Sequence, residues 1–334
     1  MNRAGEAGSA GDPPRKDSAM TKKRIACLTM ARDEDVFLSI WHRYYAGLFG
    51  AENLFVIDHN SVGKRPEAVL GAPDLNRFRI PFDTPSGTAE DDRHAFDRER
   101  FRFVSNLLSA LLRYYDTVIF NDADEVFLPD PAVAPDLAAY LETNDVPVLA
   151  GVGLEIFHHP DEEPAYDPAR PVFAQRSHYI YRFHHSKPHI LSRPCVIGGH
   201  GSRQPFRLDP DLYLMHFKYL DWGRTLERQR TLNAFFQAGR GGKRSRWRFD
   251  AREAERRMRR TLALPRREGF VHHALLGRWL GQPAPMLVDT PPDAEGRRRG
   301  ENLVQLTDIL PGEEMQETQE VLRALPGRFR GVAV

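Results

Sequence analysis

Cysteine is scarce in this chain, whose 334 residues include two, Cys27 and Cys195. Two cysteines exclude a disulfide-stabilised scaffold and a zinc site built from thiolates, and they fit a reducing compartment. Long apolar runs are lacking as well, because no window approaches the ~18 consecutive apolar residues of a membrane-spanning helix. Neither charge is in excess, since 47 Lys+Arg against 46 Asp+Glu give a net charge of +1. A protein that coats nucleic acid along its whole length is therefore excluded.

The first 20 residues have no apolar run and consist mainly of Gly, Ala, Ser, Pro and charged residues. Such a composition cannot build a core, so we expect a disordered leader over residues 1–20. The apolar centre of a secretory signal is missing from this stretch. We therefore expect a cytoplasmic protein whose ordered part begins near residue 21, directly after Met20, an alternative start.

Two apolar runs separated by a helical pattern open the ordered part. Residues 25–30 and 54–58 predict two buried strands. Between them, apolar and aromatic residues over 37–48 recur at helical spacing, and Gly50 ends the predicted helix. A strand, a helix and a strand in succession predict a βαβ unit with parallel strands.

The alternation of strands and helices continues along the chain. Further strands are predicted at 78–80, 117–120 and 148–152, and a long helix at 92–115. The stretch 170–220, rich in His and aromatic residues, predicts hairpins and loops. Helices are predicted after it, at about 222–238, 250–262, 268–280 and 314–325. The pattern is that of an α/β domain with a helical extension.

An acidic motif follows the apolar run 117–120, with Asp122, Asp124 and Glu125 close together. In open α/β sheets, ligands bind beyond the carboxyl ends of the strands. Two neighbouring carboxylates repel each other unless water or a cation lies between them, and Mg²⁺ or Mn²⁺ suits oxygen ligands. A solvated acidic turn on the surface is the alternative. The apolar residues 126–128 that follow the motif favour a site whose acids lie between buried strands.

Several segments resemble, in order, the sequence blocks of GT-A fold glycosyltransferases of the family 2 and family 92-like group. The resemblance covers about residues 24–235, with two departures, Asp33 where Asn is usual and Val126 where a larger apolar residue is usual. The segments that carry it are 29–34, 55–61, 118–128, 186–194, 198–201 and 214–219.

The resemblance implies a GT-A (Rossmann-like) nucleotide-sugar-binding domain with a mixed sheet over residues 21–235. A helical, Arg-rich C-terminal extension would occupy residues 236–334. The implied activity is transfer of a sugar from a nucleotide-diphosphate donor, a UDP-sugar, to a carbohydrate or lipid-linked acceptor. The implied cofactor is Mn²⁺ or Mg²⁺, and the implied stereochemical outcome is inversion.

The resemblance also implies roles for single residues. Asp122 and Asp124 would hold the metal, with Asp124 the direct ligand. His216 is our choice for a further metal or phosphate ligand, and His200 is the second choice. Either imidazole can equally serve as a structural hydrogen-bonding group.

The remaining roles concern the donor and the acceptor. We expect Asp58 and Asn60 to contact the nucleotide, and a phosphate-pairing role falls to Arg32, Lys187 and Arg193. Glu155 is our choice for the general base that takes the acceptor proton. Asp161 and Asp209 compete with it for that role. The adjacent histidine pairs are interpreted as structural, because neighbouring side chains point to different sides; they are 158–159, 184–185 and 272–273.

Residues 240–268 form a basic block, with 12 basic against 4 acidic side chains. One interpretation is a solvated helix, neutralised in part by nearby acids. The other is peripheral contact with an anionic membrane surface, a lipid-linked acceptor or an acidic polysaccharide. Nucleic acid is not expected, because neither a recognition motif nor a stacking platform accompanies the block.

Two other functions compete with sugar transfer. A phosphatase or phosphotransferase of the haloacid dehalogenase type would use Asp122 as its nucleophile and Asp124 as acid and base. That class needs a later strand ending in paired acids, and none follows residue 130. An anion-binding adaptor that uses the basic block is the non-enzymatic alternative, and the intact acidic motif argues against it.

Overall fold

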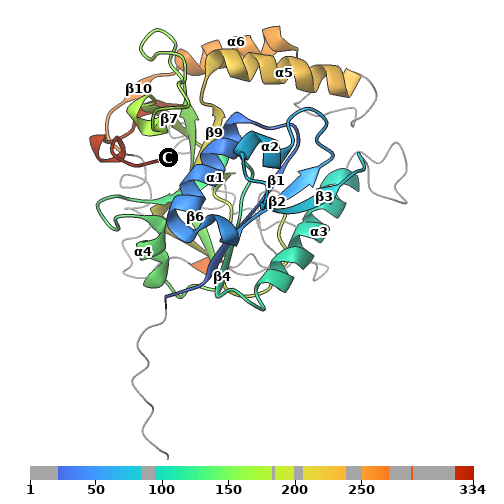
Figure 1. The fold of residues 1–334 in the computed structure, drawn as a ribbon. Coiled ribbons are helices and arrows are strands. Elements are labelled where there is room, and N and C mark those ends of the chain that lie inside the picture. Colours follow the sequence, from blue (N-terminus) through green and yellow to red (C-terminus); the bar gives the residue numbers. More distant parts are fainter. Residues whose placement is uncertain are drawn as a thin grey trace, which may run out of the picture.

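The structure, a computed structural model, describes residues 22–83, 95–182, 185–198, 206–237, 250–270, 287–288 and 320–334. Within these residues one mixed sheet runs through the molecule, with helices packed around it (Figure 1). The strands are β1 (Ile25–Ala31), β2 (Leu54–His59), β3 (Asn76–Ile80), β4 (Thr117–Phe120), β5 (Glu125–Pro129), β6 (Val148–Phe157), β7 (His178–Tyr181), β8 (Ile190–Leu191), β9 (Phe206–Tyr219), β10 (Arg266–Arg267), β11 (Leu287–Val288) and β12 (Leu322–Ala324). The helices are α1 (Val36–Phe49), α2 (Pro66–Leu70), α3 (Ala95–Leu111), α4 (Leu137–Glu142), α5 (Trp222–Gln237) and α6 (Ala251–Leu262). The predicted α/β class with a mixed sheet is confirmed.

The front half of the sheet is parallel. Strand β1 lies between β2 and β4, and β3 joins the outer side of β2, all in the same direction. The predicted βαβ unit is thereby confirmed. Helix α1 begins where the Asp35 carboxylate accepts a hydrogen bond from the Val36 N–H at 2.8 Å. It ends at Gly50, whose φ of 87° lies in the region that favours glycine.

The back half of the sheet is built around β9, which pairs antiparallel with β5 and parallel with β6. This register places His216 beside Glu125 of β5 and Glu155 of β6. The prediction of hairpins and loops over 170–220 is wrong for this part, because β9 runs for 14 residues. Pro210 interrupts the apolar pattern of β9 and hides the strand from an analysis of periodicity.

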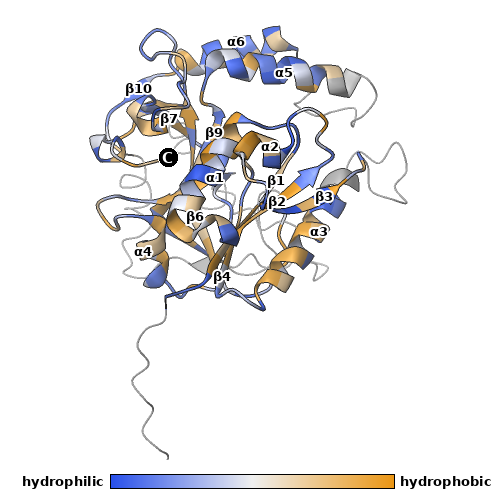
Figure 2. Cartoon of the chain, in the orientation of Figure 1, coloured by the Kyte–Doolittle hydropathy of each residue, from blue (hydrophilic) through white to orange (hydrophobic). Residues whose placement is uncertain are grey.

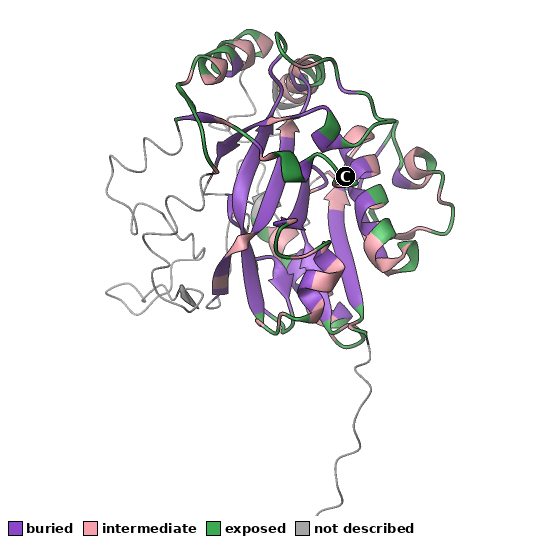
Figure 3. Cartoon of the chain, turned by 90° about the vertical axis from the view of Figure 1, so that its left-hand side faces the viewer, coloured by how far each residue is buried: buried purple, intermediate pink, exposed green. Residues whose placement is uncertain are grey.

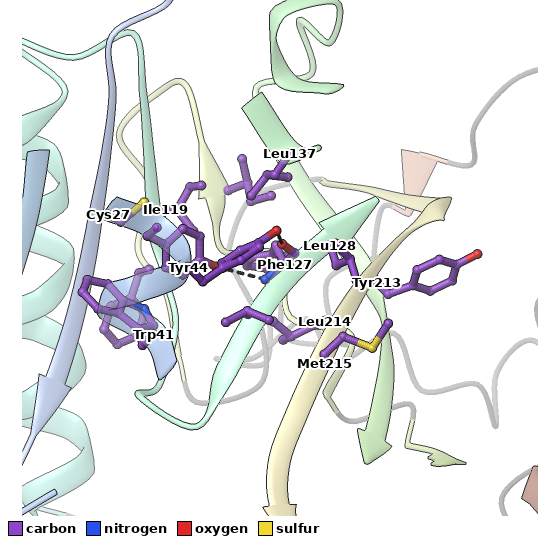
Figure 4. Packing of buried hydrophobic residues seen from close by; sticks show 14 of the residues in the cluster. Cys27, Trp41, Tyr44, Ile119, Phe127, Leu128, Leu137, Tyr213, Leu214 and Met215 are labelled. Carbon is purple, nitrogen blue, oxygen red and sulfur yellow. Dashed lines mark hydrogen bonds between the residues drawn. The ribbon is translucent and has the colours of Figure 1, made fainter. Parts of the chain in front are cut away.

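Most of the strands form the buried centre of the molecule, whereas β3 and β10 are exposed along with many helix and loop residues (Figure 3). The hydropathy of the residues follows the same division, apolar on the strands and polar on α5 and α6 (Figure 2). Aromatic side chains of α1 fill the space beside β5. The buried Tyr44 hydroxyl donates to the Phe127 carbonyl oxygen at 2.7 Å, which satisfies both groups inside the core (Figure 4).

The predicted helices at 222–238 and 250–262 are confirmed as α5 and α6, which pack against each other over the edge at which β1 ends (Figure 1). Of the predicted helix at 268–280, residues 271–280 lie outside the described part, and 268–270 are not helical.

The predicted helix at 314–325 is wrong where it can be examined, because residues 322–324 form β12 between β7 and β10. Pairing with the open edge of β7 outweighs the helical propensity of this segment. Its other predicted residues up to 319 are not described. No helix in the described ranges has the length and apolarity needed to cross a membrane.

Candidate functional site

The acidic motif lies in the tight turn between β4 and β5, at the carboxyl end of β4. Asn121, the first residue of this turn, is fully buried. Its Oδ1 accepts a hydrogen bond from Trp41 Nε1 at 3.0 Å, and its Nδ2 donates to the carbonyl oxygen of Glu125. The core thus fixes both ends of the turn and holds Asp122 and Asp124 in place.

Asp124, His216 and Glu155 form a buried chain of charged groups. His216 Nε2 lies 3.6 Å from Asp124 Oδ2, and His216 Nδ1 lies 3.0 Å from Glu155 Oε1. The other carboxylate oxygen of Glu155, Oε2, accepts a hydrogen bond from Arg182 Nε at 3.3 Å. The structure therefore brings together three residues that the sequence assigns to metal binding and to proton transfer.

The charges in this chain stabilise one another. Burial alone would lower the pKa of His216, yet the carboxylates of Asp124 and Glu155 raise it to about 10. Burial opposes ionisation of Glu155, but the hydrogen bond from His216 lowers its pKa to about 2. Burial likewise opposes ionisation of Asp124, and His216 and Arg228 together lower its pKa. Near neutral pH the imidazole is cationic and both carboxylates are anionic.

Lys187 is buried against the acidic turn. Its Nζ lies 2.9 Å from Asp122 Oδ2 and 2.7 Å from Glu125 Oε1. The second oxygen of Asp122 pairs with Arg100 from α3. Burial would lower the pKa of Lys187, but Asp122 and Glu125 raise it. Lys187 thus neutralises the turn in this structure, whereas the sequence assigns it to phosphate pairing.

His185 joins the same centre, although the sequence interpretation treats its histidine pair as structural. Its ring stacks on that of His216, with centroids 4.1 Å apart. Glu125, His185 and His216 present ligand atoms within 4.8 Å of one another. These three residues could also hold a metal, and this alternative arrangement shares His216 with the pair Asp124 and His216. His185, Arg100 and Arg228 are additions that local sequence patterns do not single out.

The loops after β1 and β2 are tied together by Asp33. Its Oδ1 accepts hydrogen bonds from the backbone N–H groups of Val62, Gly63 and Lys64 at 2.8–2.9 Å. Asp33 itself has a positive φ of 47°, a conformation that Asp tolerates better than most residues. The departure from the usual Asn at this position therefore places a charged acceptor under the second loop.

The predicted nucleotide-binding residues lie at these two loops. Asp58 is fully buried, and its Oδ1 accepts from the Ser61 N–H at 2.9 Å, so it shapes the turn after β2. Asn60 Nδ2 donates to Asp83 Oδ1 at 2.9 Å, and Arg32 Nη1 lies 2.7 Å from the same oxygen. Arg32 and Asn60 are thus brought together through Asp83, a residue that the sequence interpretation does not include.

Two predicted residues are not placed at the site. Arg193 is exposed and follows β8, whose register with β4 puts it near the amino end of that strand, away from Asp122. His200 lies outside the described residues. The competing acids Asp161 and Asp209 do not join the chain: Asp161 is exposed, and Asp209 pairs with Arg207 at 2.8 Å.

The pair Asp124 and His216 fits a divalent cation. Two metal–ligand bonds of about 2.1 Å span up to about 4.2 Å, and the ligand atoms of these residues are 3.6 Å apart. Both atoms can therefore bind one ion once His216 has given up its proton and Arg228, 3.3 Å from the same Asp124 oxygen, has moved away. Asp122 fits less well as a direct ligand, because both of its oxygens pair with cationic side chains.

No protein-family model matches the chain, and no curated protein matches its sequence. Among solved structures, glucosyl-3-phosphoglycerate synthase from Mycobacterium tuberculosis, in complex with Mn²⁺, UDP and phosphoglyceric acid, is 18% identical with a TM-score of 0.26. The match covers 39% of this chain and 43% of that one. The same synthase with Mg²⁺ and UDP is 17% identical with a TM-score of 0.25, covering 39% and 44%.

Mannose-1-phosphate geranyltransferase from Thermus thermophilus is 14% identical with a TM-score of 0.23. That match covers 92% of this chain and 76% of the other. The chain spans less than half the length of the mycobacterial structures that it matches.

Proposed function

We propose that the chain is a metal-assisted glycosyltransferase of the GT-A type. It would move a sugar from a UDP-sugar to a carbohydrate or lipid-linked acceptor with inversion, using Mn²⁺ or Mg²⁺. We assign the nucleotide-sugar-binding domain to residues 21–235 and the extension to 236–334. The observation that carries the proposal is the convergence of Asp124, His216 and Glu155 at the carboxyl edge of the sheet.

Each part of the site has a role in this proposal. Asp124 and His216 hold the metal, which would neutralise charge on the leaving diphosphate. Lys187 and Arg100 keep Asp122 ionised and fix the turn. The loops after β1 and β2, joined by Asp33, form the side on which the nucleotide binds.

Glu155 remains our choice for the general base. Its low pKa keeps it ionised near neutral pH, which is the state that a base needs. A carboxylate held by two cations is a weak base, however, so the acceptor must displace Arg182 from Oε2 before Glu155 takes the proton, while His216 stays in place as the proposed metal ligand. This requirement couples proton transfer to binding of the acceptor.

The phosphatase alternative fits the structure less well. A nucleophilic aspartate needs a carboxylate oxygen that can approach phosphorus. Here one oxygen of Asp122 pairs with Arg100 and the other with Lys187 at 2.9 Å. We therefore keep sugar transfer as the proposed function.

The basic block is a separate part of the proposal, as a peripheral contact with an anionic membrane surface. In α6, Glu253 pairs with Arg256 and Arg257, and Glu255 pairs with Arg259. The two glutamates offset two of the five arginines of α6, so the helix keeps a net positive charge that the contact would use. Co-sedimentation with anionic and with neutral vesicles tests it, and equal binding to both would contradict it.

Calorimetry with UDP tests the proposed function. We expect the wild-type protein to bind UDP in the presence of Mn²⁺ and to lose most of this affinity in EDTA. Asp124→Asn keeps the size of the side chain and removes its charge, so the metal-dependent affinity should fall about tenfold or more.

Asp145→Asn is the matched control, because the Asp145 side chain is 92% exposed and pairs with Lys23 away from the site. It should bind UDP as the wild type does. UDP binding that does not depend on metal, or equal affinity in both variants, would contradict the proposal. Hydrolysis of a phosphomonoester that is lost in Asp122→Asn would favour the phosphatase instead.

A further inference from the structure

Arg228, from helix α5, reaches the Asp124 side of the acidic turn. Its Nη1 lies 3.3 Å from Asp124 Oδ2. Its Nε lies 3.9 Å from Glu34 Oε2, in the loop after β1. The guanidinium carbon is 5.5 Å from the centre of the Phe37 ring. Arg228 therefore joins α5 to the acidic turn and to the loop after β1.

Helix α5 is firmly attached to the sheet at its first turn. The Asp221 carboxylate accepts from the Arg224 N–H at 3.0 Å and from the Tyr166 N–H at 2.9 Å. The Trp222 N–H donates to His158 Nδ1 at 2.9 Å. Because these contacts fix the start of the helix, the position of Arg228 is set by the fold and not by a surface contact alone.

Arg228 occupies the solvent side of the carboxylate that we assign to the metal. Its side chain is 35% exposed, whereas that of Asp124 is 11% exposed. The same Asp124 oxygen faces both Arg228 Nη1 and His216 Nε2, at 3.3 Å and 3.6 Å. A divalent cation on this oxygen would repel the guanidinium at such a distance.

A displaced guanidinium keeps its charge and requires another anion. Glu34 is close, but its Oε2 lies 3.9 Å from Arg228 Nε, too far for a direct hydrogen bond, so it is a weak partner for Arg228. A diphosphate bound to a metal on Asp124 would supply an anion on the side where Arg228 lies. The planar fork of arginine matches phosphate oxygens in pairs.

We propose that Arg228 is a diphosphate-binding residue that helix α5 supplies to the site. In the absence of donor it pairs with Asp124, and it exchanges Asp124 for the diphosphate when the metal binds there. This inference rests on the proposed function, since it requires a metal-bound nucleoside diphosphate at Asp124. It gives α5 a part in donor binding.

The exchange predicts two opposite effects of Arg228→Ala. Mn²⁺ without nucleotide should bind more tightly, by about threefold to tenfold, because a competing cation has left Asp124. UDP in the presence of saturating Mn²⁺ should bind about tenfold to a hundredfold more weakly, because a charge-assisted contact is lost. A purely structural role would not move the two affinities in opposite directions.

Electron paramagnetic resonance of free Mn²⁺ measures the first affinity, and calorimetry with UDP measures the second. Arg228→Lys keeps the charge and lacks the planar fork, so Mn²⁺ should bind as in the wild type and UDP more weakly. Arg230→Ala is the matched control, because Arg230 is exposed two residues farther along α5 and points to another side. Both of its affinities should stay within about twofold of the wild type.

The outcomes separate this inference from the proposed function. If the wild type does not bind UDP with Mn²⁺, the proposed function fails and the inference fails with it. If the wild type binds UDP and Arg228→Ala binds it equally well, the inference alone is overturned. Mn²⁺ that binds no more tightly to Arg228→Ala than to the wild type would also overturn it. Thermal denaturation of each variant confirms that the measured protein is folded.

Discussion

His216 Nδ1 lies 3.0 Å from Glu155 Oε1, and β9 and β6 hold the two residues opposite each other in register. The pair explains how an imidazole stays charged inside the protein, because burial alone would lower its pKa. It also orients the other ring nitrogen toward Asp124. Glu155 therefore positions a proposed metal ligand in addition to its proposed role in proton transfer.

Glu155→Gln should lower the pKa of His216 from about 10 toward its ordinary value, since one of its two anionic partners is removed. Nuclear magnetic resonance titration of the imidazole measures this change. If Glu155 is also the base, kcat should fall by more than the affinity for UDP with Mn²⁺, which the loss of its contact with His216 also weakens. An unchanged His216 titration would show that the pair does not operate in solution.

Asp33→Ala should destabilise the fold by about 2 kcal/mol, because three backbone N–H groups lose a charged acceptor. Asp33→Asn restores the residue that is usual in the resembling family and retains one acceptor oxygen, so its cost should be smaller. Urea denaturation gives both free energies of unfolding. Equal costs for the two variants would mean that the acceptor oxygen of Asp33 contributes nothing.

Arg328 attaches the last described segment to the core, with Nε and Nη2 each 2.6 Å from an oxygen of Asp130. Arg328→Ala should cost about 2 kcal/mol, because it leaves the buried Asp130 carboxylate without its cation. Asp130→Asn in the same chain should recover part of this loss. A double-mutant cycle in urea checks the coupling, and strictly additive costs would refute it.

Glu163 makes the stability of the fold depend on pH below about 4.5. Burial would raise its pKa from 4.5, but hydrogen bonds from His178, His159 and Ser177 lower it to about 2. Its contribution is complete above the unfolded value and is lost as the pH falls from about 4.5 to about 2. Glu163→Gln should therefore cost about 2 kcal/mol at pH 7, and this difference should disappear near pH 2. A difference that stays constant over this range would contradict the assignment.

Local patterns in the sequence predict the front of the fold well. The runs 25–30 and 54–57 are almost wholly apolar because their strands are buried on both faces, and the turn after 117–120 carries three acids within positions 122–125. The last described segment is different, because β12 forms by pairing with β7 at the edge of the sheet. Its own residues do not encode that partner.

The site could be predicted only in part for a similar reason. Asp122 and Asp124 are visible as a motif, whereas the contact of His216 with Asp124 and Glu155 depends on the register of β9 with β5 and β6. Arg228 lies 104 residues from Asp124 in the chain, on a helix whose charge pattern is ordinary. Contacts of this kind arise from tertiary packing, which spacing and composition do not specify.

The most direct test of the account is the position of the metal. Crystals grown with UDP and Mn²⁺, measured near the Mn absorption edge, locate the ion by its anomalous scattering. We expect one peak within about 2.5 Å of both Asp124 Oδ2 and His216 Nε2, with the diphosphate bound to the ion. A peak between Glu125 and His185 that does not touch Asp124, or bound UDP without a peak, would contradict the central claim.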